Sequence, residues 1–105
     1  MEGSILAQRE RVSLGNGMAL RLLSALEVLQ ARREAGGLAR GEAEAALCAN
    51  ACLLARALER GGQPVFADGG AALAGLSARE IGALAGRWAA FDRAENPSPE
   101  DGEER

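Results

Sequence analysis

The chain of 105 residues contains no histidine, no tyrosine and no lysine, and it has only two cysteines. Histidine is the side chain on which general acid–base catalysis most often depends, so its absence disfavours an enzyme. A zinc site takes about four Cys, His or carboxylate ligands, and the thiols here supply two at most. We therefore expect no catalytic residue, no metal site and no cofactor.

Long apolar runs and a basic surface are also missing. No stretch offers the roughly 18 uncharged apolar residues that a transmembrane helix needs. The first residues, MEGSILAQRERVS, have only a three-residue apolar patch, which is too short for a signal peptide. All twelve basic residues are arginines and the net charge is −3, which disfavours nucleic-acid binding. These features predict a cytoplasmic protein with reduced cysteines that binds neither membranes nor nucleic acids.

The composition is that of one globular domain, with 48% hydrophobic and 26% charged residues. A loosely attached N-terminal arm is expected over residues 1–15, in which residues 12–14 can be extended and residues 15–17 read as a turn. A helical domain is expected over residues 16–95. Two prolines and four acidic residues then predict a disordered acidic tail over residues 96–105.

Apolar spacing predicts two long helices in the first half of the chain. Apolar residues recur at intervals of three and four over about residues 16–35 and again over about residues 41–60. Asn16 is a suitable N-cap for the first helix, and a glycine pair follows each segment. Because the connection is short and rich in glycine, the two helices are expected to form an antiparallel hairpin.

The last helix has the clearest start signal. Ser77 and Glu80 form the capping-box pattern S-x-x-E before an apolar run, which predicts a helix over about residues 77–93. Before it, Asp68 can cap a short helical turn near residues 70–75. The expected fold class is therefore all-α, a small single domain of three main helices plus this short turn.

The predicted core consists of large apolar side chains on these helix faces and on the connector before the short turn. These residues are Leu22, Leu26, Leu29, Leu47, Leu54, Leu58, Phe66, Ile81, Leu84, Trp88 and Phe91. Trp88 is the single tryptophan, and its burial contributes up to about 5 kcal/mol of transfer free energy.

Smaller apolar residues outside these stripes are the candidate partner-binding residues. They are Val28, Cys48, Ala49, Cys52, Gly82 and Gly86. Cys48 and Cys52 lie one turn apart without further ligands, so packed small residues are favoured over a metal site or a redox pair. A second apolar side predicts that another helix packs there, from a partner or from a second copy of the chain.

A small basic cluster comes at the end of the first predicted helix and in the loop after it. Arg32, Arg33 and Arg40 alternate there with Glu34, Glu42 and Glu44. A solvated surface with salt bridges is favoured over a phosphate site.

Two patterns in the second half of the chain indicate a family. The connector reads G-x-P-x-F-x-D at Gly62, Pro64, Phe66 and Asp68, and the last helix reads L-S-x-x-E-I-x-x-L-A at Leu76, Ser77, Glu80, Ile81, Leu84 and Ala85. Over about residues 14–98 the chain resembles small tail assembly chaperones of long-tailed bacteriophages and prophages. The resemblance implies a protein that binds the helix-rich tape measure protein and keeps it soluble until the tail tube polymerises, in the host cytoplasm.

Two other classes stay open from the residues alone. A small bacterial helical interaction module, of the antitoxin or secretion-chaperone type, would use the same acidic helical surface. A helix-turn-helix DNA-binding protein would need a basic recognition helix, and the best candidate, residues 77–92, has only Arg79 and Arg87 near its exposed face. Neighbouring genes would separate the first class from the phage interpretation, and a mobility shift at low salt would test the second.

Overall fold

A computed structural model describes residues 11–95, in which four helices are combined with a four-stranded antiparallel sheet. The prediction of an all-α fold is therefore wrong. Residues 11–15 of the predicted arm belong to the sheet. Residues 1–10, and the predicted tail over residues 96–105, lie outside the described residues.

The sheet consists of two hairpins placed side by side. Its strands, in spatial order, are β1 (Arg11–Gly15), β2 (Met18–Arg21), β3 (Leu58–Arg60) and β4 (Gln63–Pro64). Each hairpin has a two-residue turn, Asn16-Gly17 in the first and Gly61-Gly62 in the second. The φ angles of these residues are 57°, 78°, 61° and 84°. Type I′ turns require positive φ at both positions, and Asn and Gly adopt it most readily.

The first predicted helix, residues 16–35, divides into β2 and the helix α2 (Ala25–Leu38). Asn16 is a turn residue and not a helix cap. The cap is Ser24, whose Oγ accepts a hydrogen bond from the Glu27 amide at 3.1 Å. The Glu27 carboxylate in turn accepts one from the Ser24 amide at 2.9 Å. This capping box fixes the helix start about two turns later than predicted.

The second predicted helix, residues 41–60, is the helix α3 (Glu42–Ala57), and its last three residues form β3. Leu20 on β2 is the cross-strand partner of Leu58 on β3, and both side chains are completely buried. Pairing in the ladder satisfies the backbone groups of both segments while their leucines enter the core. Tertiary pairing therefore outweighs the helical spacing at both places.

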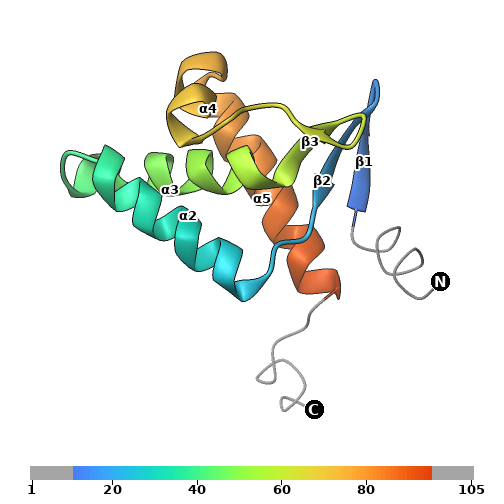
Figure 1. The fold of residues 1–105 in the computed structure, drawn as a ribbon, viewed down its shortest axis with the longest axis horizontal. Helices are drawn as coiled ribbons and strands as arrows, with labels where there is room; N and C mark the ends of the chain where they lie inside the picture. Colours follow the sequence, from blue (N-terminus) through green and yellow to red (C-terminus); the bar gives the residue numbers. More distant parts are fainter. Residues whose placement is uncertain (1–10, 96–105) are drawn as a thin grey trace, which may run out of the picture.

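The remaining helices are α4 (Gly69–Gly75) and α5 (Ala78–Glu95). Asp68 caps α4 by accepting a hydrogen bond from the Ala71 amide at 2.9 Å. The predicted capping box of Ser77 and Glu80 is confirmed, with bonds of 3.0 and 2.8 Å. In Figure 1 the sheet lies on the right and the α2–α3 hairpin on the left, and α5 crosses behind α3.

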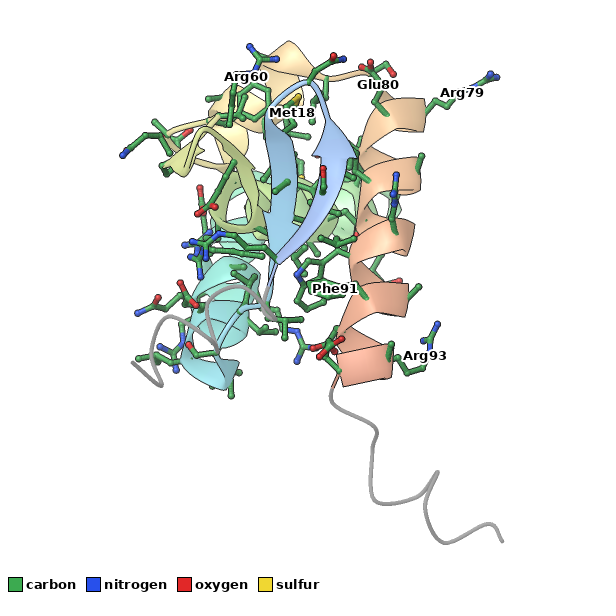
Figure 2. All side chains as sticks on the ribbon, turned by 90° about the vertical axis from the view of Figure 1, so that its right-hand side faces the viewer. Met18, Arg60, Arg79, Glu80, Phe91 and Arg93 are labelled. Carbon is green, nitrogen blue, oxygen red and sulfur yellow. The ribbon has the colours of Figure 1, made fainter. Side chains whose placement is uncertain are left out.

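The main core lies where the sheet, α3, α4 and α5 meet. Its buried residues are Leu20, Leu23, Ala51, Leu54, Ala57, Leu58, Ala72, Ile81 and Trp88. Four of the predicted core residues belong to this cluster, and four others, Leu22, Phe66, Leu84 and Phe91, are half-buried. Figure 2 shows Phe91 between α5 and the open end of the β1–β2 hairpin, away from the turn of that hairpin.

Three predicted core leucines lie outside this core. Leu26, Leu29 and Leu47 are 57%, 45% and 37% exposed. Leu47 lies on α3, and Leu26 and Leu29 are exposed because α2 turns its small residues, Ala31 and Ala35, toward α3, where they are almost completely buried. Small residues allow two helices to approach closely, so the leucines of α2 stay on its open side.

Candidate functional site

An open groove lies between α2 and the C-terminal half of α5. Both helices pack on α3, and the start of α2 and the end of α5 lie at the same end of the molecule (Figure 1). The groove has a volume of about 490 Å³ and is lined by Leu23, Ala25, Val28, Leu29, Arg32, Trp88 and Asp92. Most of these side chains are apolar, so the groove suits an apolar occupant.

The α2 wall of the groove is one face of the helix. Ala25, Val28, Leu29 and Arg32 are spaced by three and four residues, which places them along the same side. Leu26 stands beside this wall and is even more exposed than Leu29. Large apolar side chains are thus open to solvent along the edge of the groove.

The α5 wall is fixed by Trp88. Its indole Nε1 donates a hydrogen bond to the Arg21 carbonyl at 2.8 Å, and the residue is only 8% exposed. This bond attaches α5 to the end of β2 and holds the ring at the boundary between the core and the groove. The wall is therefore a fixed part of the fold.

A second, smaller hollow continues along α2 toward its C-terminal end. It has a volume of about 310 Å³ and is lined by Arg32, Ala35, Gly36, Ala39, Ala45 and Ala49. The last two residues come from the first half of α3. Arg32 lines both hollows and therefore lies between them.

On the side of α2 away from the groove, a polar side chain connects this helix to α3 and α4. Arg56 Nη1 donates to Glu34 Oε1 at 2.7 Å, and the Gly69 amide donates to Glu34 Oε2 at 2.7 Å. Burial raises the pKa of Glu34, but the hydrogen bonds from Arg56 and Gly69 outweigh it and hold the pKa below its ordinary value of 4.5. The carboxylate therefore remains charged and joins three helices.

The two candidate cysteines lie on this side, inside the protein. Cys48 and Cys52 are 5% and 0% exposed and pack against Ala31 and Ala35. Burial and the neighbouring Glu34 carboxylate raise the pKa of the Cys52 thiol to about 11. A thiol in that state is a poor nucleophile, and both side chains are buried inside the fold. Their role in this structure is packing.

The other candidate residues have different surroundings. Val28 lines the groove and Ala49 lines the smaller hollow. Gly82 and Gly86 are exposed on α5, and a Cβ at either position would meet no atom within 4 Å. They line neither hollow, so the structure does not bring all of the predicted partner-binding residues together.

An ion-pair network on the sheet was not predicted. Glu59 is 6% exposed and lies 3.0 Å from Arg11 and 3.5 Å from Arg21, and Arg21 also pairs with Glu27 at 2.6 Å. The hydrogen bond from Arg21 is the main reason that the pKa of Glu27 is lowered. The network joins the three longest strands to the start of α2 and supports one end of the groove.

Within residues 11–95, no group of three or more His, Cys, Asp or Glu side chains could hold a metal ion. Within the same range, no helix has the length and apolarity that crossing a membrane requires.

Comparisons of the chain with family profiles, with curated proteins and with solved structures find no match. The groove and the residues around it are therefore the features that indicate a function. Leu29 was expected in the core and instead lines the groove, with 45% of the residue exposed. The signal that could have placed it correctly is the capping pattern at Ser24 and Glu27, which sets the start of α2.

Proposed function

We propose that this chain binds an apolar helical segment of a partner protein in the groove between α2 and α5. The observation that supports this most directly is the exposure of Leu26 and Leu29 beside an apolar hollow. An amphipathic helix of a partner would cover these leucines and contact Val28 and Trp88. Recognition of this kind, with a helix lying in an apolar groove, is common among interaction modules.

The partner that the family resemblance indicates is the tape measure protein, which makes this chain a tail assembly chaperone acting in the host cytoplasm. Its role would be to cover apolar helical segments of that long protein until the tail tube polymerises around it. Residues of the two sequence patterns that carry the family resemblance support the groove indirectly. Phe66 packs against Gly75, Asp68 caps α4, and the last helix carries Trp88.

Co-expression with the longest helix-rich protein encoded nearby tests this proposal. We expect that protein to be soluble and to co-purify only when the chain is present. Leu29→Asp places a charge at the edge of the groove and should abolish co-purification. Ala90→Asp is the matched control, because Ala90 is exposed and lies about 200° around α5 from Trp88.

The two parts of the proposal can fail separately. If the long protein stays insoluble although the chain is well folded, the tape measure protein is not the partner, and the antitoxin or secretion-chaperone class becomes the better interpretation. If Leu29→Asp, folded by circular dichroism, captures the partner as well as the unchanged chain does, the groove is not the binding site.

A further inference from the structure

Arg32 has an unusual position on the open side of α2. The residues of α2 and its C-cap that line the two hollows are Ala25, Val28, Leu29, Arg32, Ala35, Gly36 and the C-cap residue Ala39. Their spacing places them along one face, which is about 21 Å long at about 1.5 Å per residue. Arg32 is the middle residue of this face, and the others are apolar or small.

No acidic side chain of the described residues forms an ion pair with Arg32. By contrast, Arg21 at the end of β2 pairs with Glu27 at 2.6 Å, and Arg56 on α3 pairs with Glu34 at 2.7 Å. Arg32 is exposed, so water solvates its guanidinium in the free chain. A helix that covers the two hollows would remove this water, and an uncompensated charge in such a place is unfavourable.

We infer that the occupant is an amphipathic helix with a carboxylate in the middle of its apolar stripe. This inference rests on the proposed function and adds the chemistry of the partner segment. The carboxylate would pair with Arg32, since guanidinium and carboxylate groups match in charge and in hydrogen-bond geometry. Apolar side chains on one side of the acid would enter the larger groove, and smaller ones on the other side would enter the smaller hollow.

A second copy of the chain is a poorer occupant of this face. Symmetric pairing of two α2 helices across their open faces would place the dyad near the middle of each face. The Arg32 side chains of both copies would then meet. Like charges brought together under a cover of apolar side chains repel, so the charge of Arg32 favours an acidic partner over self-association.

Synthetic peptides test this inference with the full chain. Each peptide is a helix of about 20 residues, long enough to cover the 21 Å face. Each peptide has one stripe of leucine and alanine residues and contains no tryptophan. The three peptides differ from one another only at the central residue of this stripe, which is Glu, Gln or Lys. Trp88 is the single tryptophan of the chain and lies on the groove wall, so its emission reports occupancy. Binding is measured by this emission and by the anisotropy of a label on the peptide.

We expect the Glu peptide to bind about tenfold more tightly than the Lys peptide, with the Gln peptide between them. Arg32→Glu should reverse this order. Arg33→Glu is the matched control, because it makes the same change of charge at the next residue, about 100° away around α2, and it should preserve the order.

Three results would overturn the inference. The first is equal binding of the three peptides, or an order that Arg32→Glu leaves unchanged. The second is an absence of binding to any of the peptides. The third is a dimer of the unchanged chain, seen by analytical ultracentrifugation, that Leu29→Asp dissociates, because the occupant would then be a second copy. If Leu29→Asp still abolishes capture of the long protein in the co-expression test, the proposed function survives the first two results.

Discussion

The two sides of α2 differ in how their polar residues are used. On the side facing α3 and α4, Glu34 accepts hydrogen bonds from Arg56 and from the Gly69 amide, and Ala31 is buried. On the opposite side, Arg32 lies between two hollows. One side attaches the helix to the rest of the protein, and the other leaves an apolar surface available to a partner.

This difference shows that the helix does not depend on a leucine stripe for its position. Its alanines permit close contact with α3, and the carboxylate of Glu34 connects it to two neighbouring helices. Its leucines are therefore not required for the fold and can serve binding. Substitutions on the two sides should accordingly affect different properties, stability on one side and partner capture on the other.

Trp88→Ala should have the largest effect, because Trp88 belongs to the core and to the groove wall. Loss of the ring leaves a cavity and removes the donor of the bond to the Arg21 carbonyl. We expect a loss of about 3–5 kcal/mol in the free energy of unfolding. Urea denaturation followed by far-ultraviolet circular dichroism measures it. A loss below about 1 kcal/mol would show that the ring is not part of the core.

Gly69→Ala should have the next largest effect on stability. It should disturb only the side of α2 that faces α3 and α4, and not the groove. A methyl group at Gly69 would overlap the Sγ atom of Cys52 and approach its Cα to 3.2 Å. We expect a loss of about 1–3 kcal/mol in the same assay. Adding Cys52→Ala should recover part of this loss, because it removes the overlapped atom.

Gly82→Ala is the matched control for Gly69→Ala, since the new methyl group would have open space around it on α5. It should stabilise the chain by about 0.5–1 kcal/mol, the difference in helix propensity between the two residues. If both alanine variants changed stability by the same amount, the close contact between α3 and α4 would not be a constraint.

Acid should weaken the ion pairs that connect α2 to the rest of the protein. The pKa of Glu34 and that of Glu27 are lower in the folded chain than their ordinary value of 4.5. Their contribution to stability is therefore complete above about pH 4.5 and is lost as the pH falls through the lowered values. Urea denaturation between about pH 6 and pH 3 measures this loss, and Glu34→Gln should make the pH dependence shallower. A profile unchanged by Glu34→Gln would contradict the role given to this carboxylate.

Leu29→Asp should have the smallest effect on stability. The side chain is 45% exposed, so we expect a change of about 0.5 kcal/mol or less in the free energy of unfolding. Capture of the partner should nevertheless be lost. A large loss of stability would show that Leu29 contributes to the core, and the two sides of α2 would then not be separable.

Local signals in the sequence predicted the helices well where a cap was recognised. The pattern at Ser77 and Glu80 set the start of α5, and Asp68 set the start of α4. The same S-x-x-E pattern is present at Ser24 and Glu27, whereas the apolar spacing predicts a helix that begins at Asn16. The spacing was ambiguous, because Met18 and Leu20 alternate as strand residues do and also continue a helical stripe.

The sheet depends on contacts that no local pattern defines. Asn16-Gly17 between alternating apolar residues is a strong hairpin signal, and its turn was recognised while the second strand was not. Pairing of β2 with β3 joins residues about 40 positions apart, as in the pair of Leu20 and Leu58. The groove was not predictable for the same reason, since its walls come from α2 and α5.

Amide hydrogen exchange of the chain, alone and with its co-purified partner, tests the groove most directly. We predict that partner binding protects the amides of α2 from Ala25 to about Gly36 and those of α5 around Trp88 and Asp92, while the turn at Gly61-Gly62 is unchanged. Protection confined to the sheet or to α4, with α2 and the end of α5 exchanging as in the free chain, would show that the partner binds elsewhere.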